Sequence, residues 1–482
     1  MKNHRILIFA EIELTSPLHL GSGEADSPFS DQPVFRSVGG DVVLPGSSLA
    51  GAFAALLTDE TTRFDWLGIA AQGADSQASS MIVDDALPLP AQREALRWPV
   101  EIRSLVSLDR ETLSALQDHH FNMEVVPVGT TFAFFCRCDV EGLEEKEKFL
   151  AAMRDFLSRS GSFGGKSNSG LGLWRCGKWG YQSLDLTRTF DLRSWLMDFH
   201  GLEWQGDWEE LQNHQVPVEE LASPPVNDWR LELHVKIEDG LHLSSGTSGL
   251  PVKNMPDLVQ AKRMRIAKNG KLDQAGEWID YGTALKGRFR TAMEMLLRTL
   301  LDRHTKLPRQ DVLKLVPSDP SKKPGHEKLA GFFGHTGRKG AWKVTEEAWR
   351  GAGVCRQDHI RLDEFTQHVM EGAKFDFAPL DRGEMRFAVC CDEHETTPEE
   401  SRWRKALLYG AALLLAQNVL PWGGHASRGY LGATLSICDE ETVRPENFRE
   451  DITALLKALC AGKKQAATED AATKEEMEKQ NG

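Results

Sequence analysis

The stretch LHLGSG at residues 18–23 decides the fold, because the chain repeats it as LHLSSG at residues 241–246. Three further blocks recur in the same order: PGSSLAG at 45–51 as YGTALKG at 281–287, VSLDR at 106–110 as IRLDE at 360–364, and GGKSNSG at 164–170 as GGHASRG at 423–429. Repeats of this length are whole domains rather than the short units of a solenoid. We therefore interpret the chain as two related domains in tandem.

The elements between these blocks also follow one order in both halves. An alternating strand comes first, and a Gly-Ser/Thr turn then opens a helix for which Ser47 and Thr283 are the expected N-caps. The full expectation is strands at 6–14 and 229–237, helices at 47–57 and 283–301, strands at 125–138 and 384–391, helices at 144–160 and 398–417, and closing strands at 171–179 and 430–437. This βαββαβ order predicts α+β domains, each an antiparallel sheet with helices on one face.

Length and composition limit the domain organisation and the class of protein. The 482 residues divide into a first domain at 1–190, a linker at 191–228, a second domain at 229–461 and a mobile polar tail at 462–482. A net charge of -14 excludes a uniformly basic protein, although Lys and Arg cluster locally in the second half. The eight cysteines show no CxxC spacing, and no stretch has the length and apolar character of a membrane span. We expect a cytoplasmic protein without membrane contact.

Motifs of the first half resemble those of a known family when they are taken in order. LHLGSG, DQPVFR at 31–36, LPGSSLAG at 44–51, the block from LDR to EVVPVG at 108–129, and GGKSNSG are together similar to the RAMP superfamily. The resemblance is strongest to the repeated backbone subunits of type III CRISPR effector complexes. It covers residues 6–180 and, more loosely, 229–440. Two such domains in one chain resemble the double-backbone fusions of some type III systems, the D subtype among them.

The resemblance implies a fold and a set of partners. The fold would be two ferredoxin-like or RRM-like palms, each with a β-hairpin thumb, which maps onto residues 108–128 and 362–382. The palms would hold the sugar-phosphate backbone of a crRNA, and each thumb would displace one nucleotide of the guide–target duplex. The implied partners are crRNA, target RNA, other RAMP-type subunits and the large subunit of the complex.

Two features of both halves suit contacts to phosphates. Glycines in the glycine-rich loops let a backbone approach closely while Lys and Ser side chains supply donors, and helix starts offer amides to anions. The order of residues is not that of a Walker NTP-binding loop. The predicted RNA-binding residues are Arg36, Gly46, Ser47, Ser48, Gly164, Gly165, Lys166, Ser167, Asn168, Ser169, Thr283, Lys286, Arg288, Arg290, Gly423, Gly424, His425, Ser427 and Arg428.

The resemblance also implies a cleavage site. In the family, an Asp between the first strand and the first helix is needed to cut target RNA in the presence of a divalent metal ion, Mg²⁺ or Mn²⁺. Asp31 has this register, and Asp26 is a second candidate. The second half lacks the DxPVxR motif, so Asp257 is the nearest counterpart and Asp273 a weaker one. We predict Asp31 and Asp257 as catalytic and metal-binding residues for attack of a ribose 2′-OH on the adjacent phosphate.

Three functions remain open on the sequence. The first is a backbone subunit that also cleaves target RNA, and the second is a crRNA-binding scaffold that does not. The third is a guide-processing endoribonuclease, which is disfavoured because such enzymes usually depend on a catalytic His. His19, His242 and the pair His119–His120 have no partner at a ligand spacing, so we expect structural or solvent-facing roles for them.

Overall fold

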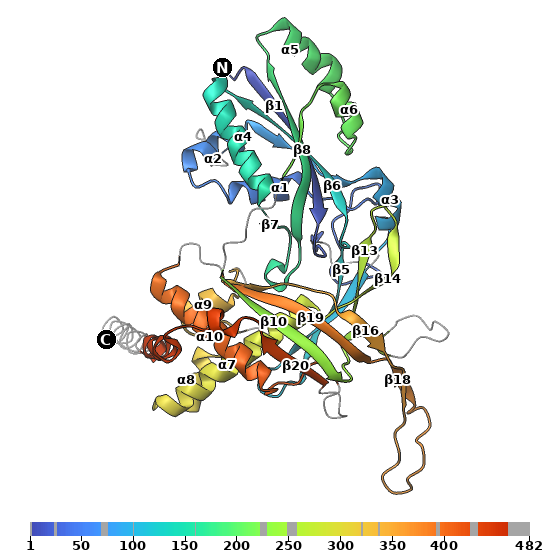
Figure 1. Cartoon of the computed structure of the whole chain (residues 1–482), viewed down its shortest axis with the longest axis vertical. Coiled ribbons are helices and arrows are strands. Elements are labelled where there is room, and N and C mark those ends of the chain that lie inside the picture. Colours follow the sequence, from blue (N-terminus) through green and yellow to red (C-terminus); the bar gives the residue numbers. More distant parts are fainter. Residues whose placement is uncertain are drawn as a thin grey trace, which may run out of the picture.

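The computed structural model describes residues 2–23, 27–68, 76–99, 101–159, 161–221, 229–247, 258–319, 322–335, 338–391, 396–424 and 432–460. They form two α+β domains that follow one another along the long axis of the molecule, each around its own antiparallel sheet (Figure 1). The predicted tail at 462–482 lies outside the described residues. None of the described helices combines the length and apolar character that a membrane span requires.

The first sheet is centred on the first predicted strand. β1 (His4–Leu14) pairs with β6 (Thr131–Val140) on one side and β8 (Leu173–Asp185) on the other, both antiparallel. The edges are extended by β2 (Met81–Val83), β3 (Leu87–Pro88), β7 (Gly161–Ser162) and β9 (Val218–Glu220). Position in this sheet fixes where the loops after β1 and before β8 emerge.

Both faces of the first sheet are buried. Ile6 and Ile8 point into a core shared with α1 (Gly46–Ala54), α2 (Glu60–Leu67) and α4 (Gly142–Ser158). Leu7 and Phe9 point the other way, into a core that residues 186–216 complete. The uninterrupted apolar run of β1 is the sequence signal of a strand covered on both sides.

Most of the predicted linker is therefore part of the first domain. α5 (Thr189–Ser194), a π-helical turn (Trp195–Phe199), α6 (Trp208–Asn213) and β9 lie over the second face of the sheet. Trp195, Phe199 and Trp204 supply the aromatic contacts. The expectation of a linker over 191–228 is wrong for these residues, because their aromatic side chains form a hydrophobic core with β1. Residues 222–228 lie outside the described part of the chain.

The second sheet has one covered face. β10 (Trp229–Asp239) lies between β19 (Leu380–Cys391) and β20 (Gly432–Ile437), with β15 (Trp342–Val344) and β16 (Arg350–Val354) on β19. Leu231 and Leu233 face the core formed with α7 (Gly282–His304), α8 (Arg309–Leu315), α9 (Glu327–Phe333) and α10 (Pro398–Ala416). The opposite face carries polar pairs such as His234 with Glu384. A short α11 (Glu440–Val443) and a helical segment at 448–460 complete the domain.

Each domain carries a β-hairpin outside its main sheet. The first hairpin, residues 101–125, is formed by β4 (Glu101–Leu108) and β5 (Ala115–Val125). The second hairpin, residues 357–377, is formed by β17 (Gln357–His359) and β18 (Phe375–Phe377), in a sheet with β11 (Ser244–Thr247) and β12 (Leu258–Gln260). The predicted strand at 125–138 is wrong, because Pro127 and the positive φ of Gly129 separate β5 from β6.

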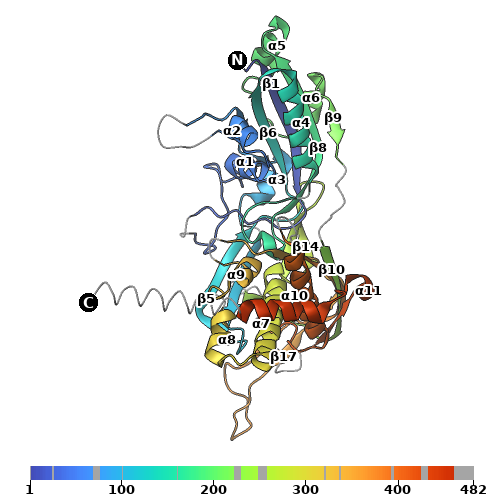
Figure 2. The same cartoon turned by 90° about the vertical axis from the view of Figure 1, so that its left-hand side faces the viewer.

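The first hairpin crosses from its own domain onto the second one (Figure 2). A further contact comes from β13 (Lys262–Ile266) and β14 (Leu272–Trp278), a hairpin of the second half. The amide of Ile266 donates to the Val128 carbonyl at 2.7 Å, and its side chain joins the first core. The remaining short helix, α3 (Pro90–Leu96), meets the same hairpin where Gly270 approaches Ala91.

Backbone hydrogen bonds repeat at the positions where the sequence repeats. Leu18 exchanges both bonds with Val126, as Leu241 does with Leu380. The amide of Gly165 donates to the His19 carbonyl at 2.9 Å, and that of Gly424 donates to the His242 carbonyl at 2.8 Å. A Cβ on Gly164 or Gly423 would lie 2.2 or 2.7 Å from the same carbonyls, so both glycines are required by close approach.

Candidate nucleic-acid interface

Asp31 belongs to the loop after β1. It lies against the edge of β5, a strand of the first hairpin. Its Oδ2 accepts the amide of Asn122 at 2.7 Å, and the next residue, Gln32, continues along the strand through the Asn122 carbonyl and the Glu124 amide. The loop after β1 thus adds a short parallel partner to β5 and fixes the Asp31 carboxylate in place. The other carboxylate oxygen has no partner among the described residues and faces outward, since Asp31 is exposed.

His19 lies two residues further along the same strand edge. Its Nδ1 is 2.8 Å from the Glu124 carbonyl, and because a carbonyl can only accept, Nδ1 carries the proton. Burial lowers the pKa of His19, so its ring is neutral near pH 7 and Nε2 keeps a lone pair. The structural role expected for His19 is present, but its place beside Asp31 was missed. The repetition of LHL in both halves was the available signal.

Lys166 covers the neighbouring aromatic ring of the same strand. It has a left-handed backbone (φ +56°) at the glycine-rich loop, and its Nζ lies 5.0 Å from the centroid of the Phe121 ring. No carboxylate is paired with it among the described residues, and desolvation lowers its pKa. An ammonium near His19 and over Phe121, the residue before Asn122, gives this part of β5 the positive charge that a phosphate would recognise.

Lys286 brings the second domain to the same region. It lies in the first turns of α7 with its Nζ 5.1 Å from the Trp342 ring centroid, and no acid among the described residues pairs with it. Burial lowers the pKa of Lys286 to about 7, helped by the positive charges of Arg290, Lys339 and Lys166. Lys166 and Lys286 therefore form a basic pair across the domain junction.

The other predicted basic residues are engaged inside the protein. Arg36 binds Glu124 at 2.5 Å and the Leu96 carbonyl at 2.7 Å, which fixes the loop that carries Asp31. Arg288 pairs with buried Asp280 at 3.1 Å and lies over Trp422. These contacts make Arg36 and Arg288 structural residues and remove the support for phosphate contacts by them.

Arg290 belongs to a buried cluster around one carboxylate. Glu294 accepts from Arg290 at 2.9 Å and from Arg110 of the first hairpin at 2.6 Å, while Arg298 lies 3.9 Å away. Arg290 and Arg298 belong to the local cluster of Lys and Arg in the second half of the sequence. Both lie at Glu294, and the same carboxylate binds Arg110 and so holds the first hairpin.

The helix starts do not offer the free anion sites that we expected. The N-caps are Pro45 and Tyr281, and neither Ser47 nor Thr283 makes a capping hydrogen bond, which corrects that prediction. The Gly46 amide already donates to Asp85 at 2.8 Å, and the Gly282 amide donates to Glu346 at 3.1 Å. A carboxylate at the first amide of each helix disfavours a phosphate there. The amide of Ser48 donates to the Pro45 carbonyl within the first turn and so is not free either.

The rest of the GGKSNSG loop packs between the domains. The three residues Ser167–Ser169 form a 3-10 turn, and the Asn168 side chain donates to the Gly340 carbonyl at 2.7 Å. Asn168 and Ser169 are buried there, so they support domain docking rather than contact with a ligand. Ser167 is half-buried at the rim of the same turn.

A buried ion cluster fastens the first hairpin to the second domain. Arg103 donates to both oxygens of Glu346 at 2.7 and 2.9 Å and to Glu101 at 2.7 Å, and lies over the Tyr281 ring. Burial by itself would lower the pKa of Arg103, but the two carboxylates reverse the effect and raise it. All of the partners are satisfied, which fixes the Asp31 edge relative to Lys286.

Several predicted residues lie outside the described part of the chain: Asp26, Asp257, His425, Ser427 and Arg428. Asp273, the weaker counterpart in the second half, lies on β14 and accepts the Ala275 amide at 3.0 Å. The described residues contain no group of three or more His, Cys, Asp and Glu that could hold a metal ion. Among the described residues 27–36 of this loop, Asp31 is the one carboxylate, and by itself it does not make a metal site.

Comparison with known families addresses the first domain. A search of curated proteins finds no match to the chain. Residues 11–175 match the family model of the RAMP superfamily. The match runs from within β1 to the start of β8 and so contains α1, the first hairpin, Asp31 and the glycine-rich loop. It supports, for the first domain, the likeness to the RAMP superfamily that the motifs indicate.

Proposed function

We propose that this chain is a crRNA-binding backbone subunit of a type III CRISPR effector complex, and that it cleaves target RNA at Asp31. The RAMP match over residues 11–175 supports RNA binding by the first domain. The observation that carries the cleavage proposal is that Asp31, His19 and Lys166 each contact the strand β5, at Asn122, Glu124 and Phe121 respectively. The likeness of the second half to a RAMP domain rests on the repeated hydrogen bonds of both glycine-rich loops.

The reaction would be an internal transesterification. The ribose 2′-oxygen forms a bond to the neighbouring phosphorus while the bond from phosphorus to the 5′-oxygen breaks, giving a 2′,3′-cyclic phosphate and a 5′-hydroxyl. One proton leaves the 2′-hydroxyl and one reaches the 5′-oxygen. Asp31 can accept or orient the first proton through Oδ1, since Oδ2 is held by Asn122. Lys166 would place positive charge beside the phosphate.

A divalent metal ion, Mg²⁺ or Mn²⁺, remains part of the proposal for Asp31 and Asp257. One carboxylate is too few for a preformed protein site, because Mg²⁺ needs several oxygen ligands. RNA phosphates and water would have to complete the coordination. Cleavage by the second domain through Asp257 is proposed on the repeat alone.

The second candidate is a scaffold that binds crRNA without cutting. It is favoured by one observation, namely that the Asp31 carboxylate has a structural role at the Asn122 amide. A variant that keeps this role and removes the charge separates the two functions. Asp31→Asn does so, because its side-chain carbonyl can still accept from Asn122.

The test uses the assembled complex with guide and complementary target RNA. We expect Asp31→Asn to slow one cut by about 10²–10⁴-fold, the usual contribution of a general base, while guide binding is unchanged. The matched control is Asp155→Asn on α4, an exposed residue paired with Arg159, which should cut like the wild type. An unchanged cut pattern in Asp31→Asn would leave the scaffold as the function.

A further inference from the structure

The turn of the first hairpin lies against the second domain and closes a small pocket with it. The pocket has a volume of about 190 Å³ and lies between the hairpin turn, α7 and α8. Three guanidinium groups from three elements meet there. The polar lining consists of Arg110 and Glu111 of the hairpin, Arg298, Thr299 and Asp302 of α7, and Arg309 of α8.

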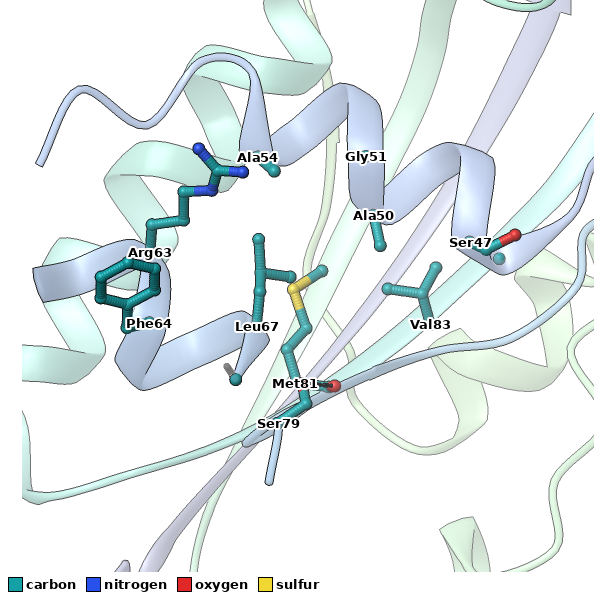
Figure 3. Close-up of a pocket in the computed structure, with 12 residues that line it drawn as sticks. Ser47, Ala50, Gly51, Ala54, Arg63, Phe64, Leu67, Ser79, Met81 and Val83 are labelled. Carbon is teal, nitrogen blue, oxygen red and sulfur yellow. Dashed lines mark hydrogen bonds between the residues drawn. The ribbon is translucent and has the colours of Figure 1, made fainter. Parts of the chain in front are cut away.

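A hollow in the first domain has a different lining. It has a volume of about 570 Å³, lies between α1, α2 and β2, and is lined by apolar side chains such as Leu67 and Met81 (Figure 3). Arg63 is the charged residue of its lining. The smaller pocket is instead the place where charged side chains converge, and a few convergent polar groups are a mark of a binding site.

Arg110 is buried and has few acceptors. The residue is 9% exposed, and its Nη1 donates to Glu294 at 2.6 Å. A guanidinium group has five N–H donors, and the described part of the chain holds no other side-chain or carbonyl acceptor for this one. Burial lowers the pKa of Arg110, and the positive charges of Arg290 and Arg298 lower it further, against the effect of Glu294. The surroundings of Arg110 are therefore short of negative charge.

Arg298 has the same shortage. Its side chain is 14% exposed, and its Nη1 lies 3.4 Å from the carbonyls of Val316 and Pro317 and 3.9 Å from Glu294. Charge-assisted hydrogen bonds are normally about 2.7–2.9 Å long, so all three contacts are weak. Glu294 is also shared, because its Oε1 accepts from two other arginines. Arg298 is thus a largely buried cation without a strong acceptor.

The acids near the pocket do not remove the shortage. Glu111 pairs with Arg309 at the rim. Asp109 influences Arg298 only from a distance, and its Oδ1 accepts two amides of the hairpin turn. Asp302, one turn after Arg298 on α7, is exposed and makes no ion pair with a described residue. An anion inside the pocket would supply the acceptors that these carboxylates do not.

The size and the donors of the pocket select the class of anion. Drug-sized ligands occupy pockets of about 300 Å³ or more, so about 190 Å³ suits a smaller group. Phosphate presents several oxygens and binds the planar fork of arginine through paired hydrogen bonds. The hydroxyl of Thr299, an exposed residue at the mouth of the pocket, can donate as well.

We propose that this pocket binds a phosphate group, which joins Arg110 of the first hairpin to Arg298 and Arg309 of the second domain. The group is free inorganic phosphate or a backbone phosphate of RNA. Because the pocket is complete only while the hairpin is docked, phosphate stabilises the docked arrangement by mass action. The proposal does not rest on cleavage, since Asp31 contacts Asn122 near the base of the hairpin and the pocket lies at the turn.

The first experiment is isothermal titration calorimetry of the RNA-free full chain with inorganic phosphate, at constant ionic strength with chloride as the balancing anion. We expect saturable binding. Arg298→Met keeps an apolar stem in place and should lower phosphate affinity at least about tenfold, as loss of a charge-assisted hydrogen bond does. The matched control is Arg303→Met, an exposed residue of α7 outside the pocket, which should bind phosphate like the wild type.

A second variant tests the sign of the charge that the pocket takes. Asp302→Asn removes a negative charge at the rim, and the exposed position should leave folding unaffected. Phosphate affinity should rise about two- to fivefold, the size of the effect of a solvent-exposed charge pair. A lower affinity would contradict an anion at this site.

Hydrogen exchange then locates the phosphate and identifies its source, because the Lys166–Lys286 pair is also a phosphate contact in the proposed function. Phosphate should slow amide exchange at residues 109–114 in the wild type but not in Arg298→Met. The measurement is repeated with saturating single-stranded RNA that lacks a terminal phosphate. If phosphate still slows the turn, the site takes free phosphate; if RNA alone slows it and phosphate adds nothing, the site takes the RNA backbone. A wild type that binds no phosphate, or equal affinity in the wild type and Arg298→Met, would overturn the proposal.

Discussion

The hairpin of the first domain lies against the second domain, whereas the hairpin of the second domain projects away from both (Figure 1). Their turns are nearly the same. Asp109 accepts the amides of Glu111 and Thr112, and Asp363 accepts those of Phe365 and Thr366. A residue with positive φ follows in each, Leu113 (+57°) and Gln367 (+56°).

The difference lies in the side chains along the two hairpins. The first hairpin has Arg103 and Arg110, which reach buried carboxylates of the second domain at 2.7 and 2.6 Å. The second hairpin has Gln357 and Glu364 at these positions. One local structure thus serves two purposes, because docking is decided by the charged side chains rather than by the turn. Docking also brings Lys286 of the second domain near Lys166.

The largest effect is expected when the docked hairpin is released. Arg103→Met leaves Glu101 and Glu346 buried without a counter-charge, and loss of one partner from a buried ion pair costs about 3–5 kcal/mol. We therefore expect a lower free energy of unfolding in urea. Glu364→Met, at an exposed position of the projecting hairpin, is the control and should change stability by less than about 0.5 kcal/mol. Equal effects would show that the two hairpins do not differ in docking.

A smaller, pH-dependent effect is expected at Lys286. Its pKa of about 7 lies below the ordinary value, and a bound phosphate would favour the ammonium, so RNA binding takes up a proton above pH 7. RNA affinity should fall by up to about tenfold per pH unit above pH 7. Lys286→Arg should flatten the profile and keep the affinity, and Lys286→Met should flatten it at low affinity. A flat wild-type profile in fluorescence anisotropy would exclude Lys286 as a phosphate contact.

The same residue makes a prediction about stability. Because the folded state lowers the pKa of Lys286 to about 7, it binds fewer protons than the unfolded state between that pH and the ordinary lysine pKa. Above the ordinary lysine pKa, Lys286 is neutral in both states and does not disfavour folding. As the pH falls toward 7, the unfolded state gains a proton that the folded state does not, so the free energy of unfolding falls. Lys286→Met should raise the melting temperature of the RNA-free chain at pH 7. An unchanged or lower melting temperature would contradict a lowered pKa for Lys286.

The smallest effect is expected at Lys166. One phosphate contact changes the slope of log affinity against log salt by about 0.7–0.9. Lys166→Ala should reduce the slope by that amount. Lys146→Ala on α4, where Lys146 already has a glutamate partner, is the control and should leave the slope unchanged. If both variants keep the wild-type slope, Lys166 does not contact RNA.

The sequence allowed the fold and the place of the site to be predicted because both depend on short repeated motifs. LHL and the glycine pairs mark the same hydrogen bonds in both halves. The register of Asp31 placed it on the loop that pairs with β5. A fifth repeat was missed: VDDA at 83–86 and VTEEA at 344–348 both supply the carboxylate at the helix start, but they differ in length by one residue.

Residues whose role depends on distant partners could not be assigned from the sequence. Arg290 and Arg288 look like a basic surface of a helix, and only the fold brings Asp280 and Glu294 against them. Asn168 looks like a ligand donor until the second domain is in place to accept from it. The aromatic residues at 195–204 look like part of a linker, because nothing in their own segment shows that they pack on Leu7 and Phe9 of β1.

The most direct measurement is to map where a guide RNA touches the chain. Guide RNA with photoreactive uridines is crosslinked in the assembled complex, and the modified peptides are identified by mass spectrometry. We predict crosslinks to Phe121 and its neighbours on β5, to the start of the glycine-rich loop around Lys166, and to the first turns of α7 around Lys286. Crosslinks confined to the polar outer face of the second sheet, around His234, would show that the guide does not run along β5.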